Sequence, residues 1–426
     1  MINNKKLKIA VVGLGYVGFP LAIEFAKKGV LVAGVEIDQG RLAHIRRKES
    51  YITDVATRQL RGVLEKKTFS ATSDFSVLKE CSAVLVCVPT PLKRKYLPDI
   101  SYIKDSLGSV ARNIKKGALV ILESTTYPGT TEEVILPIFK SQNLEHGKDF
   151  YLCFSPERID PGNKDFPVNK IPKVVGGLNA KATRMALSLY RIIIDKVVPV
   201  SSPRAAETVK LLENTFRLVN IGLIDELAMM CHKMKIDIWE IIRAASTKPF
   251  GFMPFYPGPG VGGHCIPKDP LYLYWKAKSF GFNSRFIRLA SGIVNYMPEY
   301  VALRIEEELL KRGLKLKGSS ILVSGVTYKK DVKDLRKSPS IDIIKELKKR
   351  GVRVTYSDPL IPYLNIDQVH LRSIPITKSA LARFDCLVVA TDHSNVDYKT
   401  IFSASKLIFD TRCVYRDTID DKLVRL

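Results

Sequence analysis

The residues most able to do chemistry lie around a single cysteine. Cys265 stands in the stretch PGPGVGGHCIPKDP, and Asp269 follows it four residues later. A thiolate is a nucleophile that can hold an aldehyde carbon as a thiohemiacetal and, after a further oxidation, as a thioester, while a carboxylate nearby moves the proton. The glycines would let substrate and backbone approach the sulfur closely. The stretch alone leaves open the alternative of a buried, inert cysteine.

A second polar pair would support such a thiol. Lys210 and Asn214 are four residues apart in a stretch with helical periodicity, so their side chains leave one face of the helix. An ammonium group and an amide placed in this way stabilise an oxyanion, although a solvated surface pair is the alternative. His264 suggests a cysteine–histidine hydrolase or a metal site, but sequence neighbours rarely share a direction. Because no second cluster has ligand spacing, we expect no metal.

The amino-terminal segment has a pattern typical of dinucleotide binding. GLGYVG places Gly13, Gly15 and Gly18 between the apolar run KIAVV and a helical stretch, and Glu36 ends the next apolar run. The first glycine makes a turn, the second admits a pyrophosphate, the third allows close packing, and the acid binds a ribose hydroxyl. An acid repels a 2′-phosphate, so we predict NAD over NADP, with Arg41 nearby as a counter-indication. A flexible glycine turn and a flavin site are the alternatives.

The elements that must position these residues alternate along the chain. Short apolar runs without internal alternation, separated by helical stretches, indicate a parallel sheet covered on both faces. From Pro203 to Lys233 a long helix interrupts this pattern and offers a surface for dimerisation, and strand–helix alternation returns at Ser319. We predict an α/β protein with two Rossmann-like, doubly wound domains joined by a central long-helix domain. The predicted boundaries are 1–200, 201–312 and 313–426.

Composition excludes several classes of protein. The chain has 426 residues, 46% of them hydrophobic, and seven cysteines without a Cys-x-x-Cys pair, which favours a soluble protein of the reducing cytoplasm. The apolar run Ile9 to Ile23 is shorter than the roughly 20 residues that span a bilayer, so we expect no membrane segment. The net charge of +24 is spread over short clusters. This pattern suits an anionic small substrate better than nucleic acid.

Taken in order along the chain, these motifs resemble those of the UDP-glucose/GDP-mannose dehydrogenase family. The resemblance rests on GLGYVGFPLA, CVPTP, ESTTYPGTTEE, SPERIDPGN, ETVKLLENTFRLVNIGLIDELA, GVGGHCIPKDP, GVTYKKDVKDLRKSPS and DTR. It implies four-electron, NAD-dependent oxidation of the C6 hydroxymethyl group of a UDP-sugar. In such an enzyme, Cys265 would carry the thiohemiacetal and thioester, Lys210 and Asn214 would stabilise the oxyanion, and Asp269 would assist proton transfer.

The resemblance also assigns the binding residues. Thr125 and Glu157 would place the water and the sugar, and the third domain would bind the UDP phosphates through Lys329 and Arg412. The implied cofactor residues are Gly13, Gly15, Tyr16, Val17, Gly18, Glu36, Arg41, Pro89, Thr90, Thr125 and Arg336. The implied substrate residues are Glu157, Arg158, Lys210, Asn214, Lys248, Tyr256, Gly262, Lys329 and Arg412. The long helix would form the core of a homodimer, and the active site would lie between the two α/β domains.

The identity of the sugar rests on a few positions. TKPFGFMPFYPGPGVGGHCIP resembles the branch that oxidises UDP-N-acetylglucosamine or its manno epimer, and Lys248 and Arg158 point the same way. Lys268 departs from that branch and is typical of UDP-glucose enzymes. We therefore expect UDP-N-acetylglucosamine first, UDP-N-acetylmannosamine second and UDP-glucose third, with a non-catalytic nucleotide-sugar-binding protein as a remote alternative.

Overall fold

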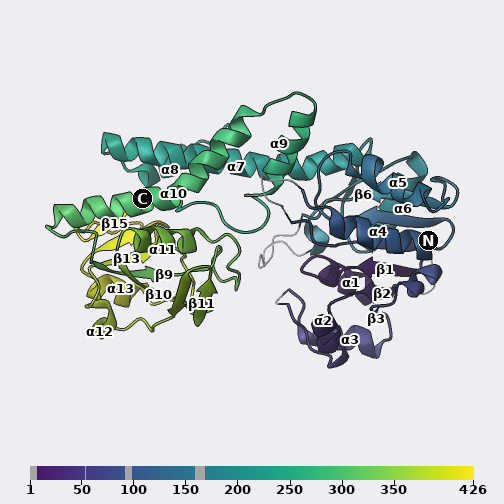
Figure 1. The fold of residues 1–426 in the computed structure, drawn as a ribbon, viewed down its shortest axis with the longest axis horizontal. Helices are drawn as coiled ribbons and strands as arrows, with labels where there is room; N and C mark the ends of the chain where they lie inside the picture. Colours follow the sequence, from purple (N-terminus) through teal and green to yellow (C-terminus); the bar gives the residue numbers. More distant parts are fainter. Residues whose placement is uncertain (1–6, 53, 92–97, 159–167) are drawn as a thin grey trace. The chain divides into compact units, whose positions relative to one another are not determined.

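A computed structural model describes residues 7–52, 54–91, 98–158 and 168–426 (Figure 1). The chain divides into two compact units. The first consists of Met1–Glu213 and Leu271–Phe282, and the second of Asn214–Pro270 and Asn283–Leu426. Both contain a sheet with helices, which confirms the predicted α/β class. The boundaries of the three predicted domains stay a prediction.

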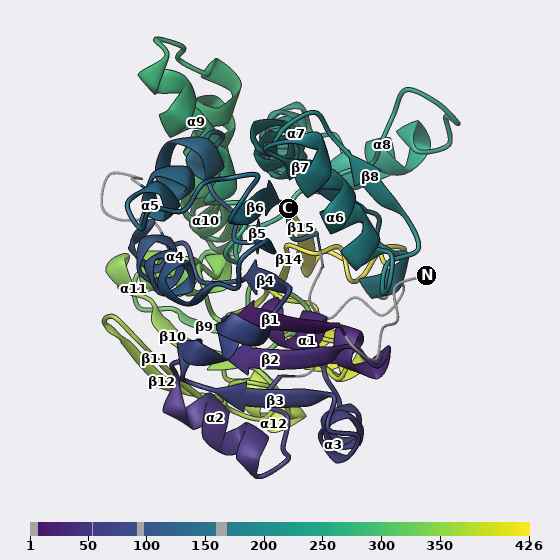
Figure 2. The same cartoon turned by 90° about the vertical axis from the view of Figure 1, so that its right-hand side faces the viewer.

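The first unit is built on an eight-stranded sheet with the order β3-β2-β1-β4-β5-β6-β7-β8. Its strands are β1 (Lys8–Val12), β2 (Leu31–Val35), β3 (Phe69–Thr72), β4 (Ala83–Val86), β5 (Ala118–Leu122), β6 (Phe150–Phe154), β7 (Lys173–Gly177) and β8 (Val197–Pro199). Figure 2 shows β3, β2, β1, β4, β5 and β6 in this order. Neighbouring strands are parallel except at β6 and β7, which pair antiparallel. The order β3-β2-β1-β4 places the end of β1 at the point where the sheet changes direction, where dinucleotides bind.

Helices cover both faces of this sheet, which is why the central strands β4, β5 and β6 are fully buried and apolar. On one face, Phe19 of α1 and Tyr190 of α6 pack with Val11 of β1. On the other, Leu107 of α4 and Phe139 of α5 pack on the alternate strand residues. The helices of this region are α1 (Gly18–Lys27), α2 (Gln39–Arg46), α3 (Thr57–Glu65), η2 (Phe75–Glu80), α4 (Ser101–Asn113), η4 (Thr131–Ile135), α5 (Leu136–Lys140), η5 (Val168–Lys170) and α6 (Ala180–Tyr190).

The predicted long helix is confirmed as α7 (Pro203–Met234). Its proline stands at the first turn, where the missing N–H costs no hydrogen bond. The helices that follow are α8 (Ile238–Ala245), α9 (Asp269–Ser279) and α10 (Arg285–Lys311). Asp237 caps α8, because its side chain accepts a hydrogen bond from Trp239 N at 2.8 Å. The boundary between the two units falls within α7, after Glu213.

The second unit contains a five-stranded parallel sheet with the order β10-β9-β13-β14-β15. Ile344 of α11 and Val301 of α10 pack on one face, and Leu381 of α12 and Ile401 of α13 on the other. The elements are β9 (Ser320–Ser324), α11 (Pro339–Lys349), β10 (Arg353–Ser357), the hairpin β11 (Tyr363–Ile366) and β12 (Val369–Arg372), α12 (Lys378–Leu381), β13 (Cys386–Val389), α13 (Tyr398–Ala404), β14 (Ile408–Asp410) and β15 (Leu423–Arg425). Among the residues described, no helix combines the length and the apolar character needed to cross a membrane.

Candidate active site

The three glycines between β1 and α1 have different surroundings. Gly13 has a φ of +88°, and a Cβ there would meet the carbonyl oxygen of Cys87 at 2.7 Å. A Cβ on Gly18 would lie 2.0 Å from the Gly13 oxygen. At Gly15, in contrast, a Cβ would meet nothing closer than Arg41 Nη1 at 3.9 Å. Gly13 and Gly18 are therefore required by the fold, whereas Gly15 leaves open space beside the backbone.

The same turn suits an anion. Val17, at the N-cap of α1, supplies no side-chain hydrogen bond to the helix. The amino end of a helix attracts negative charge through its unpaired N–H groups and its dipole. Tyr16 and Pro89 are exposed, and Thr90 is buried. The Thr90 carbonyl accepts a hydrogen bond from Tyr272 Oη at 2.5 Å, which ties this segment to α9. These observations fit the pyrophosphate of a dinucleotide.

Glu36 directly follows β2 and is buried. Its Oε2 accepts hydrogen bonds from Leu14 N at 2.9 Å and Arg41 Nη1 at 3.0 Å, and its Oε1 accepts from Ile37 N at 2.9 Å. The carboxylate therefore fixes the glycine turn to the end of β2. Arg41, which the sequence had marked as a counter-indication to NAD over NADP, forms an ion pair with this carboxylate. The acid is at the position where a ribose hydroxyl would bind.

Thr125 and Glu157 follow the neighbouring parallel strands β5 and β6. Thr125 is half-buried and Glu157 is buried. The carboxyl ends of parallel strands lie at one edge of a sheet, so both residues reach the edge at which ligands bind in such folds. Arg158 donates from its main-chain N to Glu157 Oε1 at 2.6 Å, while its guanidinium pairs with Glu213 Oε1 at 2.7 Å. Lys210 is buried on α7 in the same unit.

Cys265 and Asp269 are joined by the backbone of the loop ahead of α9. The Cys265 carbonyl accepts hydrogen bonds from Lys268 N at 3.0 Å and Asp269 N at 2.8 Å. Asp269 Oδ2 accepts a further bond from Asn214 Nδ2 at 2.6 Å, and both side chains are buried. Cys265 itself is exposed, whereas the other six cysteines are buried. The second unit thus brings together Cys265, Asn214 and Asp269, three of the predicted catalytic residues.

The glycines beside Cys265 make room for protein as well as for a ligand. A Cβ on Gly262 would lie 2.6 Å from Tyr328 Cβ, and one on Gly263, where φ is +84°, would lie 2.8 Å from the Tyr328 ring. Gly263 N also donates to Arg336 O at 2.9 Å. The sequence led us to expect space for the substrate here. In the structure, Tyr328 and the backbone near Arg336 occupy part of it.

The predicted UDP residues lie on the loops after β9 and β14. Lys329 is half-buried, and its carbonyl accepts a hydrogen bond from Thr327 Oγ1 at 2.9 Å. Arg412 donates from Nε to Ala390 O at 2.9 Å, and burial lowers the pKa of its guanidinium. Arg336 is exposed and paired with Asp334 Oδ2 at 2.6 Å. All are in the second unit.

The remaining substrate candidates are exposed. Lys248 has its Nζ 4.9 Å from the centroid of the Phe250 ring. Tyr256 is stacked on Trp239, with the ring centroids 6.0 Å apart. The predicted site residues are therefore divided between the two units. The first unit holds the cofactor turn, Glu36, Arg41, Pro89, Thr90, Thr125, Glu157, Arg158 and Lys210, and the second holds the others. A single site that combines them stays a prediction.

Buried charges near this machinery were missed by sequence reasoning. Asp225 on α7 accepts a hydrogen bond from Gly258 N at 3.0 Å, and burial raises the pKa of its carboxyl to about 8. Glu123, at the end of β5, pairs with Lys173 at the start of β7. Sequence reasoning singled out His264 but not its protonation. Burial and, to a smaller extent, the nearby Lys268 lower the pKa of its imidazole to about 4. The sequence does contain a signal for Glu123 and Lys173, since each is a charged residue at the edge of an apolar strand run, in LVILE and PKVVGG respectively.

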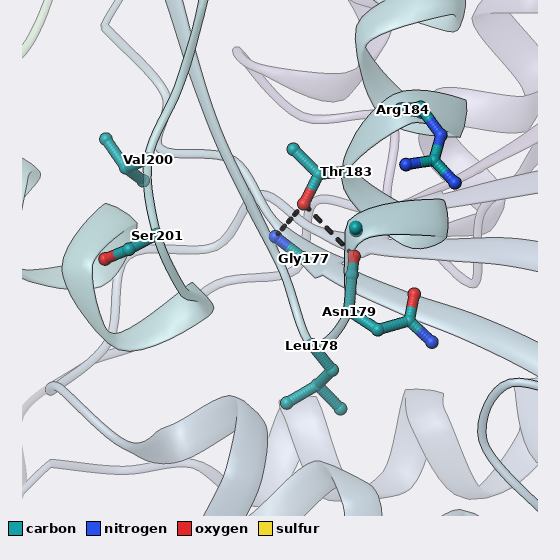
Figure 3. Close-up of a pocket in the computed structure, with 8 residues that line it drawn as sticks. Gly177, Leu178, Asn179, Thr183, Arg184, Val200 and Ser201 are labelled. Carbon is teal, nitrogen blue, oxygen red and sulfur yellow. Dashed lines mark hydrogen bonds between the residues drawn. The ribbon is translucent and has the colours of Figure 1, made fainter.

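A hollow of about 380 Å³ lies at the amino end of α6 (Figure 3). It is lined by Gly177, Leu178, Asn179, Ala180, Thr183, Arg184, Val200 and Ser201. Thr183 Oγ1 accepts from Gly177 N at 3.1 Å and donates to the Asn179 carbonyl at 3.2 Å, and Asn179 caps the helix. The side chains of Thr183 and Asn179 are thus used by the fold, and none of the predicted site residues lines the hollow.

Comparisons with known proteins bear on the family of the chain. Family models of the UDP-glucose/GDP-mannose dehydrogenase family match residues 7–194 (NAD binding domain), 204–295 (central domain) and 322–417 (UDP binding domain). A UDP-N-acetyl-D-glucosamine 6-dehydrogenase of Pseudomonas aeruginosa is 39% identical over 92% of this chain and 91% of its own. A UDP-N-acetyl-D-mannosamine dehydrogenase of Pyrococcus horikoshii is 35% identical over 96% of each chain.

Solved structures are also similar. A UDP-D-ManNAc dehydrogenase from Pyrococcus horikoshii has a TM-score of 0.88 at 33% identity, over 98% of this chain and 99% of that one. The fold, the glycine turn and these matches define an NAD-dependent UDP-sugar dehydrogenase. The chain belongs to the UDP-glucose/GDP-mannose dehydrogenase family.

Proposed function

We propose that this protein oxidises the C6 hydroxymethyl group of UDP-N-acetyl-D-glucosamine to the carboxylate. Each sugar consumes two NAD⁺ and one water and yields two NADH and three protons. The main support is the 39% identity, over 92% of the chain, to a relative that carries this activity in its name. UDP-N-acetyl-D-mannosamine is the second candidate, because the similar relative and solved structure from Pyrococcus horikoshii carry the name of that activity.

The proposed chemistry uses Cys265 as the nucleophile. Its thiolate adds to the C6 aldehyde and forms a C–S bond, giving a thiohemiacetal. After the second oxidation, the same sulfur holds C6 as a thioester, and water releases the uronic acid and the thiolate. Asp269, which is buried and bonded to Asn214, takes up protons. Asn214 and Lys210 stabilise the oxyanions that form at C6.

The cofactor and the nucleotide would bind at the ends of strands. NAD supplies the hydride acceptor when it is bound. The turn from Gly13 to Gly18 would hold the pyrophosphate, Glu36 a ribose hydroxyl, and Thr90 and Thr125 the neighbouring groups. Lys329 and Arg412 would hold the UDP phosphates. Thr125 and Glu157 would position the sugar and the hydrolytic water.

NADH formation with a panel of UDP-hexoses tests the proposal. The panel contains UDP-N-acetylglucosamine, UDP-N-acetylmannosamine and UDP-glucose. UDP-glucose is included because Lys268 is typical of enzymes that oxidise it. We expect two NADH per sugar, and the highest kcat/KM for the first. Cys265→Ser should bind both ligands but stall at the aldehyde or at a slowly hydrolysed ester. Absence of NADH with every sugar would contradict dehydrogenase activity, and turnover of Cys265→Ser at the parental rate would contradict the nucleophile.

We also propose a homodimer through the central helices. Phe216, Leu223, Met230 and Met234 of α7 are exposed. At 100° per residue they lie within about 40° of one another around the helix. On α10, Phe286, Leu289, Tyr296, Leu303 and Leu310 are exposed at intervals of three and seven residues. Apolar stripes of this kind are typical of helices that pack against a partner. The seven free cysteines suit the reducing cytoplasm, where we place the enzyme.

A further inference from the structure

A cluster of buried charges lies next to Glu157. Lys173 at the start of β7, Glu123 after β5 and Tyr190 at the end of α6 are each at most 5% exposed. The Lys173 ammonium forms an ion pair with Glu123 Oε2, and the Tyr190 hydroxyl donates to Glu123 Oε1. The same ammonium lies 3.5 Å from Glu157 Oε2. One cation is therefore shared between a carboxylate of the core and a carboxylate of the candidate site.

This arrangement keeps the lysine charged in a dry environment. Burial alone would lower the pKa of Lys173, but the neighbouring carboxylates of Glu123 and Glu157 outweigh it and raise that pKa. Burial raises the pKa of Glu123, and Lys173 acts against this effect. An ion in such a place must be compensated, because removal of one partner leaves an uncompensated buried charge. Glu123 and Tyr190 thus hold the ammonium at a fixed point.

Glu157 is held from two sides. Its Oε1 accepts the hydrogen bond from Arg158 N at 2.6 Å, and its Oε2 faces Lys173 Nζ. The Arg158 side chain is used elsewhere, because its guanidinium bonds to the Pro172 carbonyl at 2.6 Å and to Glu213. Lys173 is therefore a cation that can set the orientation of the Glu157 carboxylate.

We propose that Lys173 is a positioning residue for Glu157. Fixed by Glu123 and Tyr190, its ammonium holds the Glu157 carboxylate in one orientation while that carboxylate places the sugar and the hydrolytic water. This inference rests on the proposed function. It predicts that loss of the ammonium impairs turnover far more than ligand binding, and that the acidic limb of the pH dependence of kcat moves, because a buried cation beside the candidate site is lost.

The test is a double variant that removes the cation together with its core partner. Lys173→Met/Glu123→Gln removes the core carboxylate together with its cation, so Glu157 is the carboxylate that loses the ammonium, and the glutamine oxygen can still accept from Tyr190. We expect UDP and NAD to bind within about threefold of the parent, kcat to fall about 100-fold, and the acidic limb of the kcat–pH profile to move to higher pH. The single variant Lys173→Arg keeps a cation at this position and should retain most of the parental activity. Lys170→Met, at an exposed ion pair with Asp195, is the matched control.

Glu123→Gln alone gives a second and opposite prediction. The ammonium then interacts mainly with Glu157, so the acidic limb should move to lower pH and turnover should persist. A folded double variant with parental kcat and pH profile would overturn the proposal. If the double variant does not fold, a parental profile in Glu123→Gln overturns it instead. Failure of the proposed function is a separate result, because the parent itself would then form no NADH with any UDP-hexose.

Discussion

At the scale of single residues, Cys265 differs from the other cysteines in its surroundings. The six others are buried. Burial raises the pKa of Cys81 to about 11 and those of Cys153 and Cys386 to about 12. A thiol in such a place has little thiolate character and no access to solvent. Accessibility therefore agrees with the choice of Cys265 as nucleophile, which the sequence had left open between a reactive and an inert thiol.

Thiol labelling follows from this difference. In the folded protein, an aromatic disulfide reagent should react rapidly with one of the seven cysteines, and with all seven after unfolding in denaturant. UDP-N-acetylglucosamine should slow the rapid reaction, and Cys265→Ser should abolish it. Absorbance of the released thiol measures both. Two or more rapid equivalents, or a rapid equivalent that persists in Cys265→Ser, would contradict the assignment.

At the scale of elements, the turn between β1 and α1 contains two glycines with different roles. Gly15 is the one that we expect to lie against the cofactor, and Gly18 is required by the fold. Gly15→Ala adds a methyl group to open space, so folding should be unchanged while the KM for NAD rises at least about 10-fold, because the pyrophosphate loses its close approach. Gly18→Ala is the matched comparison and should destabilise the protein, since its methyl group would meet the Gly13 oxygen. Thermal melting and NAD-dependent rates distinguish the two. Parental KM in Gly15→Ala would contradict a pyrophosphate at this turn.

The hydrogen bond from Gly258 N to Asp225 joins the cysteine loop to α7 and leads to a prediction about pH. The folded protein holds a proton on Asp225 up to about pH 8, against 3.8 for an ordinary aspartate. Its contribution to stability is therefore complete below about pH 4 and is lost as the pH rises to 8, by about 1.4 kcal/mol per pH unit. Asp225→Asn keeps the acceptor for Gly258 N and avoids this loss.

The melting temperature of Asp225→Asn relative to the parent should therefore rise between pH 5 and pH 8. Asp417→Asn, at an exposed position, is the control and should give a constant difference. Differential scanning fluorimetry across this range measures both variants. A constant difference for Asp225→Asn as well would mean that its carboxyl is ionised throughout.

The sequence predicted those parts of the structure that depend on neighbours along the chain. The turn at Gly13 to Gly18 and helix α7 follow from glycine spacing and helical periodicity over short stretches. The pairing of Glu123 with Lys173, 50 residues apart, and of Asp225 with Gly258, 33 apart, depends on the packing of distant elements. No local pattern determines such pairs. The resemblance to the family supplied the chemical roles, which the periodicity could not.

At the scale of the whole molecule, the exposed stripe of α7 predicts an assembly. Sedimentation velocity should give a dimer for the parent, and Leu223→Arg/Met230→Arg should give a monomer, because two cations cannot be buried in an apolar contact without partners. Ile419→Arg, at a fully exposed apolar residue outside the helices, should remain dimeric. A monomeric parent, or a dimer that tolerates both arginines, would contradict an interface on this stripe.

The contact of Gly262 and Gly263 with Tyr328, together with the bond from Gly263 N to Arg336 O, bears on how new specificities arise in this family. Residues 257–270 and 326–339 fit each other closely, although 55 residues separate them in the sequence. Recombination that replaces only one of the two segments would bring mismatched surfaces together and damage the loop that carries the thiol. Hybrid enzymes should therefore be active when both segments come from the same parent, and we expect the two segments to be inherited together.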